Sequence, residues 1–346
     1  MKYLYGMLMA LSFSGGLLTP NLLYGQTPGK LPLVKIIATG GTIANSADGR
    51  MSVETILKQI PQVEAIANIE VYDYVRIGSS EISIQNWIDI ANVITQELKN
   101  NPEIDGVVVT HGSNTSEETA WFLNLVLDTD RPVVITAAQR QRDALSEDSS
   151  RNFYDAVRVA AHPQSAGRGV LLVTNEMIHS ARDVTKTLGH RVESWNSGDT
   201  GVLGLSDIDM IRFYRMPTTR HTANSEFRLT GITRAAQLPR VDIVYAYVDA
   251  GPELVQAAVK AGAKGIVVAG FPTGSSSPAM NKALAAARDS GVAIIMGNRG
   301  GDGRIKTDRE FISADNLSPQ KARILLMLAL IKKPTNDRLK EIFLSY

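Results

Sequence analysis

The sequence predicts an α/β protein with two domains, a larger N-terminal parallel-sheet α/β domain and a smaller C-terminal α/β domain. A chain of 346 residues, 44% of them hydrophobic, is long and apolar enough for two cores of ordinary size. Short β-branched apolar runs alternate with helical patterns, which is typical of parallel strands joined by crossover helices. A polar, irregular stretch separates two such series. We therefore predict domains at residues 30–215 and 240–346 with a linker at 216–239.

The composition argues against several classes of function. The net charge is +1, with 36 basic and 35 acidic residues, so no basic surface for nucleic acid is expected. The chain has no cysteine, which excludes disulfides, thiolate zinc sites and cysteine nucleophiles. Its five histidines are scattered without metal-ligand spacing. We expect neither a metal nor a cofactor.

The first 25 residues have the pattern of an export signal. A single early charge, Lys2, precedes a mostly apolar run at residues 4–24 and the small residue Gly25. The alternative is a membrane anchor, but serine, proline and asparagine residues interrupt the run, and a stable anchor needs about 20 uninterrupted apolar residues. We expect a mature protein that begins near Gln26, is periplasmic or secreted, and has no membrane contact.

The N-terminal series begins with the apolar run of residues 34–38, followed by Gly40, Gly41 and Thr42. Two glycines let the backbone turn sharply and approach a ligand closely. Thr42 would then stand at the carboxyl end of a buried strand, where open α/β sheets bind their ligands. Its hydroxyl is a candidate nucleophile beside free backbone N–H groups. The alternative is a glycine turn in which Thr42 is a local cap.

Further strand and helix patterns follow in order. Strands are predicted at 71–77, 106–110, 132–138 and 169–174, and helices at 53–60, 83–99 and 151–161. The second of these helices is amphipathic, because Trp87, Ile88 and Ala91 recur at helical spacing. Residues 45–50 and 78–81 are polar loops that each follow a strand.

The loop after the 106–110 strand contains His111, Ser113 and Asn114. Thr115 and Glu118 fit a capping box for the helix that follows, which explains these two residues structurally. Ser113 and Asn114 are left without such an explanation. We interpret His111 as a hydrogen-bonded loop histidine rather than a catalyst.

The C-terminal series is shorter and follows the same alternation. Strands are predicted at 241–248, 265–269 and 292–296, and helices at 252–261, 278–290, 321–330 and 337–343. A glycine-rich loop at 300–303 is expected to be flexible.

Three separated stretches resemble the signatures of bacterial L-asparaginases. Residues 39–44 (TGGTIA) resemble the first signature, residues 110–115 (THGSNT) with 117–120 (EETA) the second, and residues 183–187 (DVTKT) the stretch holding the catalytic lysine of the family. The similarity covers almost the whole mature chain, including residues 316–323. With its export signal the chain resembles the secreted type II branch. The resemblance implies hydrolysis of L-asparagine to L-aspartate and ammonia by a homotetramer with sites between subunits.

The resemblance also implies a catalytic set. Thr42 matches the nucleophile, Ser113 stands where a second threonine is usual, Lys186 matches the lysine, and Asn114 takes the position of an aspartate. A hydroxyl nucleophile splits amide hydrolysis into acylation and deacylation, and it needs a base. A lysine is such a base only when desolvation lowers its pKa. Without the family match, we would interpret Lys186 as a solvated surface lysine.

The implied substrate-binding set overlaps the catalytic one. Ser79 matches a serine that holds the substrate's carboxylate, and Ser80 takes the place of a Gln or Glu that helps to hold its amino-acid end. Ser113, Asn114 and Ala138 belong to the same set. Asp249 stands near the position from which the family contributes a residue to a neighbouring subunit's site.

Two departures from the family pattern keep other functions open. Asn114 is neutral where a carboxylate normally contacts the substrate's ammonium, and the loop between residues 44 and 53 lacks the tyrosine of the family's mobile lid. One alternative is therefore a related amidase acting on glutamine or another amide, such as an N-substituted asparagine. Another is a non-catalytic binding protein that kept the fold and lost the chemistry.

Overall fold

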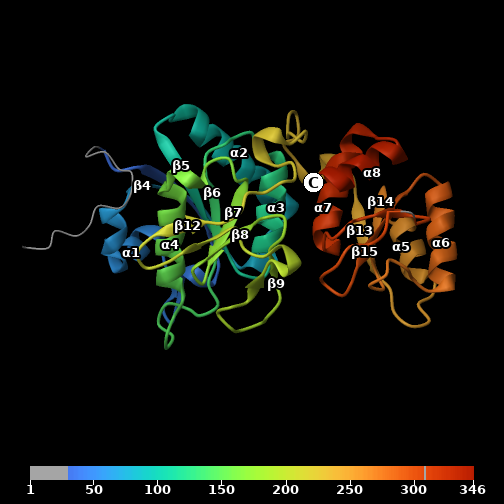
Figure 1. The fold of residues 1–346 in the computed structure, drawn as a ribbon, viewed down its shortest axis with the longest axis horizontal. Helices are drawn as coiled ribbons and strands as arrows, with labels where there is room; N and C mark the ends of the chain where they lie inside the picture. The colour runs from blue at the N-terminus through green and yellow to red at the C-terminus, as the bar shows by residue number, and fades with distance from the viewer. Residues whose placement is uncertain (1–29, 308) are drawn as a thin grey trace, which may run out of the picture. The chain divides into compact units, whose positions relative to one another are not determined.

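The computed structural model describes residues 30–307 and 309–346. The predicted signal peptide at residues 1–25 lies outside the described residues. A large sheet of eight strands and a small sheet of four organise the rest of the chain (Figure 1). The predicted fold class, a larger N-terminal and a smaller C-terminal α/β domain, is confirmed, whereas the residue boundaries of the domains stay a prediction.

The large sheet has the strand order β12-β11-β8-β7-β6-β5-β1-β4. Five of its strands are parallel: β1 (Leu33–Gly40), β4 (Asn68–Ile77), β5 (Ile104–Thr110), β6 (Val133–Thr136) and β7 (Val170–Thr174). Three short strands extend one edge in antiparallel fashion: β8 (Met177–Ser180), β11 (Gly204–Ser206) and β12 (Ile211–Phe213). The sequence patterns did not predict this antiparallel edge, because runs of three or four residues are too short to show a period.

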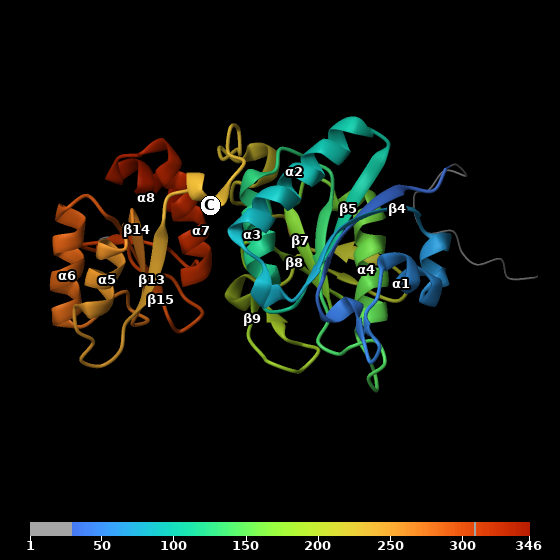
Figure 2. The ribbon, with the colours of Figure 1, turned by 180° about the vertical axis from the view of Figure 1, so that it is seen from behind.

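Helices cover both faces of the large sheet (Figures 1 and 2). One face packs against α1 (Val53–Gln59) and α4 (Ser149–Ala161), the other against α2 (Ile84–Asn100) and α3 (Ser116–Val126). Neighbouring side chains of β1 alternate accordingly, with Ile36 in the first core and Ile37 in the second. Burial on both faces explains why the strands are continuous apolar runs.

The order of the strands creates a topological switch point at the carboxyl edge of the large sheet. β1 leads to α1 on one face, while its neighbour β5 leads to α3 on the other face. The loops after these two strands therefore diverge, which is the arrangement in which open α/β sheets bind ligands.

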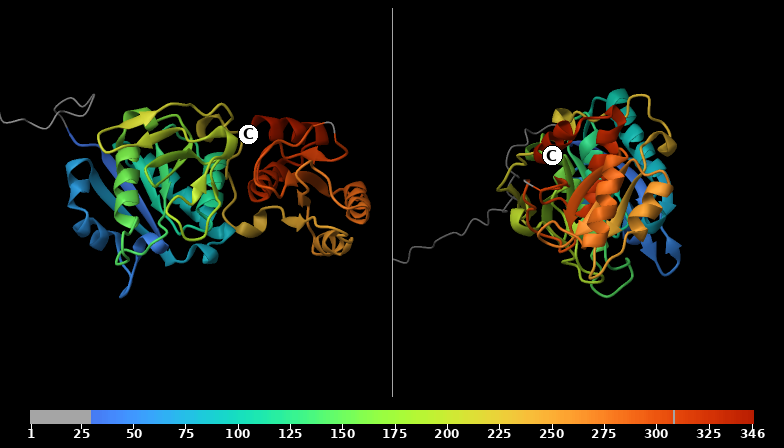
Figure 3. Two further views of the ribbon diagram at one scale, coloured as in Figure 1. Left: turned by 60° about the horizontal axis from the view of Figure 1, so that its bottom comes forward. Right: turned by 90° about the vertical axis from the view of Figure 1, so that its right-hand side faces the viewer.

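The small sheet is entirely parallel, in the order β13 (Val241–Tyr245), β14 (Gly265–Gly270), β15 (Ala293–Asn298) and β16 (Ile312–Ser313). Helices α5 (Glu253–Lys260) and α6 (Pro278–Asp289) cover one face, and α7 (Pro319–Ala329) covers the other (Figure 3). The last helix, α8 (Asn336–Ser345), follows. α7 also packs on α3, where the Trp121 indole donates to the carbonyl of Lys321 at 3.0 Å. One apolar core thus continues from the large sheet to the small one.

Two hairpins lie outside the main sheets. β2 (Asn45–Ser46) pairs with β3 (Gly49–Arg50), where a loop was predicted, and β9 (Thr185–Lys186) pairs with β10 (Trp195–Asn196). Residues 214–239, all of them described, contain two short 3₁₀ turns, Thr222–Asn224 and Ala235–Gln237. Among the helices that the structure describes, none is long and apolar enough to cross a bilayer.

Candidate active site

Three turns meet at the carboxyl edge of the large sheet, after β1, β4 and β5. The Gly41 N–H donates to the carbonyl of Ile77 at 3.0 Å, which ties the first turn to the end of β4. Gly41 has φ +81°, and a methyl group on it would lie 2.3 Å from Cα of Gly112. Only glycine allows this approach between the two backbones. The residues that follow, Thr42 and Ser113, are therefore presented from two backbones in direct contact.

Ser79 joins the turn after β4 to the turn after β5. This side chain is 7% exposed, and its Oγ accepts a hydrogen bond from the backbone N–H of Asn114 at 3.1 Å. The carbonyl of Ser79 accepts from the Thr115 hydroxyl at 2.8 Å. The predicted capping box is therefore wrong. Thr115 is the N-cap residue of α3, but its hydroxyl binds Ser79 and makes no side-chain cap with Glu118.

Lys186 reaches the same turn from the β9–β10 hairpin. Its Nζ donates to Ser113 Oγ at 2.7 Å and to Asn114 Oδ1 at 2.9 Å, and lies 5.9 Å from the centre of the Trp195 ring. Burial lowers the pKa of Lys186 below the ordinary lysine value. Lys186 is thus half-buried and hydrogen-bonded to the Ser113 hydroxyl, unlike a solvated surface lysine. A lowered pKa is what a lysine needs to act as a general base.

Residues of α3 and α7 form hydrogen bonds to the backbone at and just before Lys186. The Lys186 N–H donates to Glu117 Oε2 at 3.2 Å, and the amide of Gln320 donates to Glu117 Oε1 at 3.0 Å. Nζ of Lys321, which is 1% exposed, donates to the carbonyl of Arg182 at 2.8 Å and to that of Val184. Burial lowers the pKa of Lys321 to about 8. These positioning contacts were not predicted, although the resemblance at residues 316–323 marked the segment that makes them.

His111 supports the second turn as a neutral side chain. It is fully buried, and burial lowers its pKa to about 4. Nδ1 lies 2.8 Å from the carbonyl of Gly112, which can only accept, so Nδ1 carries the proton. Nε2 then accepts from the Thr119 hydroxyl at 2.9 Å, and that oxygen accepts from the Trp87 indole at 2.8 Å. The prediction of a hydrogen-bonded loop histidine is confirmed.

The other predicted site residues are less constrained. Thr42 begins a 3₁₀ turn one residue after β1, is half-buried, and has no hydrogen-bond partner for its hydroxyl among the described residues. Ser80 is exposed, and Ala138 is buried just beyond the end of β6. Asp249 stands in an exposed turn after β13 with φ +60°. Within the described chain, Asp249 makes no hydrogen bond to the three turns of the large sheet.

The β2–β3 hairpin occupies the place where the sequence comparison expected a lid. Arg50 anchors it, since Nε donates to Asn45 Oδ1 at 3.2 Å and Nη1 donates to the carbonyl of Arg76 at 2.7 Å. On the other side, the Ala47 N–H donates to Asp143 Oδ2 at 2.7 Å. The hairpin thus presents an arginine next to the end of β4, which sequence reasoning did not identify.

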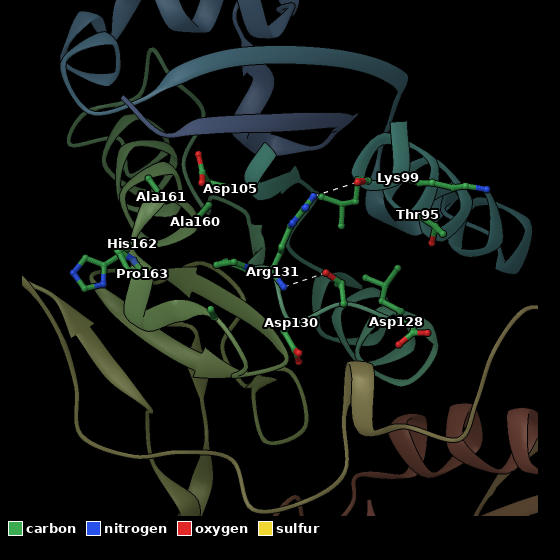
Figure 4. A pocket seen from close by; sticks show the side chains of 15 residues that line it. Thr95, Lys99, Asp105, Asp128, Asp130, Arg131, Ala160, Ala161, His162 and Pro163 are labelled. Atoms are coloured by element: carbon green, nitrogen blue, oxygen red, sulfur yellow. Dashed lines mark hydrogen bonds between the residues drawn. The ribbon is translucent and has the colours of Figure 1, made fainter. Parts of the chain in front are cut away.

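A cavity of about 840 Å³ lies away from the turns that carry Thr42, Ser79 and Ser113, at the amino ends of β5, β6 and β7 (Figure 4). Arg131 projects into it and donates to the carbonyls of Leu98 and Pro102 at 3.2 and 3.0 Å. This guanidinium is thus bound to main-chain groups of the wall. A smaller cavity of about 310 Å³ lies between the β9–β10 hairpin, which carries Lys186, and residues 300–303.

Comparison with known proteins covers both halves of the chain. The family model described as "Asparaginase, N-terminal" matches residues 33–219, and "Glutaminase/Asparaginase C-terminal domain" matches residues 240–343. L-asparaginase 2 of Bacillus subtilis is 38% identical, covering 91% of this chain and 87% of that protein. A probable periplasmic L-asparaginase of Haemophilus influenzae is 38% identical, covering 87% and 89%. A glutaminase-asparaginase of Pseudomonas fluorescens is 37% identical, covering 93% and 92%.

A solved structure agrees with these sequence relatives. The crystal structure of a probable cytoplasmic L-asparaginase from Campylobacter jejuni superposes with a TM-score of 0.87 at 36% identity. It covers 91% of this chain and 100% of its own.

Proposed function

Because this chain belongs to the asparaginase family and is an asparaginase-type amidohydrolase, we propose that it hydrolyses L-asparagine through an acyl-enzyme on Thr42. The resemblance found in three sequence stretches is thereby confirmed at the level of the family. One observation supports the site assignment above all. The Lys186 amine lies 2.7 Å from the Ser113 hydroxyl, on the turn whose Gly112 packs against Gly41.

In the proposed acylation, the Thr42 oxygen attacks the amide carbon of asparagine. Neutral Lys186 takes a proton through Ser113, and that proton passes to the leaving nitrogen as the C–N bond breaks and ammonia departs. Water then attacks the ester, the Thr42 oxygen regains a proton, and aspartate is released. Backbone N–H groups of the glycine turns are suited to stabilise the oxyanion, a contribution worth about 2.7–4 kcal/mol per donor in other enzymes.

A coupled ammonia assay on the purified mature chain tests this proposal. Wild-type protein should release ammonia from L-asparagine, and Thr42→Ala should fold normally and lose nearly all turnover, since alanine cannot form an ester. Mass spectrometry of quenched wild-type reactions should find an adduct on the peptide carrying Thr42. Substantial ammonia release by Thr42→Ala would reject the nucleophile assignment. Binding of asparagine or aspartate without ammonia release would favour the non-catalytic alternative.

A second candidate substrate is glutamine or another amide. It is favoured by the neutral Asn114 and Ser80 at positions expected to hold the amino-acid end, and by the relative named glutaminase-asparaginase. A panel of asparagine, glutamine and N-substituted asparagines compared by kcat/KM separates the two candidates. A kcat/KM higher for glutamine than for asparagine would replace the main proposal.

We also propose a homotetramer in which Asp249 completes a neighbouring subunit's site. The supporting feature is an exposed apolar strip beside Asp249, made of Tyr245, Tyr247 and Val248, which are 52%, 49% and 85% exposed. Light scattering on a size-exclusion column should give four times the mass of the mature chain. Val248→Asp should reduce that mass, and a monomeric, active wild type would reject the proposal.

Export to the periplasm or the medium is the proposed location. It is supported by the pattern of residues 1–25 and by the Haemophilus relative that is named periplasmic. Amino-terminal sequencing of protein recovered outside the cytoplasm should begin near Gln26. Recovery with Met1 intact would contradict removal of a signal peptide.

A further inference from the structure

Arg50 of the β2–β3 hairpin reaches the turn that carries Ser79. A methyl group placed on Gly78 would lie 3.4 Å from Nη2 of Arg50, 3.0 Å from Oε2 of Glu81 and 3.8 Å from Oγ of Ser80. The missing side chain at Gly78 thus leaves a space on which all three polar groups converge. Ser80 takes the family position that helps to hold the amino-acid end of the substrate, so Arg50 lies beside that end.

The Arg50 guanidinium is held in place but has binding capacity left. Nε and Nη1 are fixed by Asn45 Oδ1 and the carbonyl of Arg76, whereas Nη2 has no hydrogen-bond partner among the described residues. An arginine stays protonated at any physiological pH and presents donors that match a carboxylate. A preorganised guanidinium loses little side-chain freedom when it binds such a group.

The charged groups around this space are one carboxylate, from Glu81, and one guanidinium, from Arg50. Asn114 and Ser80 are neutral. The Glu81 carboxylate accepts the backbone N–H of Gly78 at 2.7 Å with the oxygen that faces the space. On β4, Arg76 pairs with Asp73, and these two charges offset each other. Arg50 is therefore the cation whose Nη2, without a hydrogen-bond partner among the described residues, faces this space.

We propose that Arg50 is a specificity-determining residue that binds the carboxylate of the substrate together with Ser79. The enzyme then accepts ω-amides of dicarboxylic acids, and an α-ammonium group on the substrate contributes little. This inference rests on the proposed function, because it takes the substrate's carboxylate to lie at Ser79. A purely structural Arg50 would instead brace the hairpin and affect all substrates alike.

Three substrates that differ by one group each separate these roles. L-Asparagine carries both a carboxylate and an ammonium, succinamate lacks the ammonium, and β-alaninamide lacks the carboxylate. Wild-type kcat/KM for succinamate should lie within about tenfold of that for asparagine. Arg50→Met should raise KM for asparagine and succinamate by about 10- to 100-fold, the usual worth of a hydrogen bond to a charged group, and leave β-alaninamide unchanged. The KM values of Arg50→Lys for asparagine and succinamate should lie between those of the wild type and those of Arg50→Met.

Arg76→Met is the matched control, since it removes an exposed arginine from the adjacent strand, and its KM values should equal those of the wild type. Unchanged KM values in Arg50→Met, or an equal loss on all three substrates, would overturn the proposal. Calorimetric binding of L-aspartate and succinate gives a readout that does not require turnover. Wild-type protein that binds both without releasing ammonia contradicts the proposed function, while a loss of that binding in Arg50→Met still supports the carboxylate contact. If wild-type protein bound neither L-aspartate nor succinate, the proposed carboxylate contact of Arg50 would be overturned.

Discussion

At the scale of single residues, the proposed mechanism makes activity at neutral pH depend on the protonation of Lys186. The amine is a base only when neutral, and burial lowers its pKa from the ordinary value. Its polar neighbours Ser113 and Asn114 are both uncharged, so neither holds a proton on the amine. Activity should therefore rise with pH through the Lys186 pKa, at a pH below that of an ordinary lysine.

Asn114→Asp tests this electrostatic account. The new carboxylate stabilises the charged amine and raises the pKa of Lys186, so kcat at neutral pH should fall and the pH optimum should move upward. The same change should improve binding of an α-ammonium by on the order of 1 kcal/mol, which lowers KM several-fold. Steady-state kinetics from pH 6 to 10 measure both effects. Asn114→Ala adds no charge and should leave the pH optimum in place. If Asn114→Asp changed neither kcat, KM nor the pH optimum, this side chain would face neither Lys186 nor the substrate's ammonium.

His111 makes stability depend on pH. Burial lowers its pKa from 6.5 to about 4, so the folded state favours the neutral ring and the unfolded state binds the extra proton. This stabilisation is complete above pH 6.5 and is lost as the pH falls towards 4, on the order of 3 kcal/mol in total. Urea unfolding at pH 7 and pH 5 should show the decrease. His111→Gln should weaken the pH dependence, while His179, also shifted to about 4, retains part of it.

At the scale of elements, the start of α7 controls where β9 lies. Lys321 ties together two carbonyls that precede Lys186, and Gln320 fixes Glu117, which accepts the Lys186 N–H. The position of Lys186, the proposed base, thus depends on a helix of the small sheet, although its amine lies at the edge of the large one.

Lys321→Met should lower both stability and turnover. It leaves two buried carbonyls without a donor, at a cost of roughly 1–3 kcal/mol each, and it frees the segment that carries Lys186. Urea unfolding and kcat measure the two effects, and KM for asparagine should change little. Lys332→Met removes a lysine from the exposed turn after α7 and serves as the control. Wild-type kcat in a folded Lys321→Met protein would show that β9 does not need this support.

The elements with long periodic patterns were predictable, and so were the turns that follow them. Residues 34–38 and 106–110 predict buried strands, and Thr42 was expected at the carboxyl end of the first. Only the family resemblance placed Thr42 and Ser113 in one site. Arg50 and Glu117 were not predicted, because their roles depend on hydrogen bonds to residues far along the chain. Gln320 is 203 residues from Glu117. The capping box predicted for Thr115 was wrong because its hydroxyl donates instead to the carbonyl of Ser79, 36 residues away in sequence.

At the scale of the whole molecule, the two sheets share one apolar core through α3 and α7. Trp121 is fully buried and donates to the carbonyl of Lys321, so removing the small sheet would expose both the indole and the apolar face of α3. A chain that ends at residue 239 should therefore bind the dye ANS strongly and unfold at lower urea concentration than the full chain. A compact fragment with wild-type stability would contradict this interdependence.

The cavity around Arg131 offers a use for the enzyme outside its chemistry. β5 has seven residues, which places its amino end about 20 Å from the turn that carries Ser113. Lys99 is exposed beside that cavity, at the end of α2. A tether or a fluorophore attached to Lys99 would lie at the edge of the sheet opposite to the reacting groups. Immobilisation through this side chain would leave the edge with the proposed active site facing the solution.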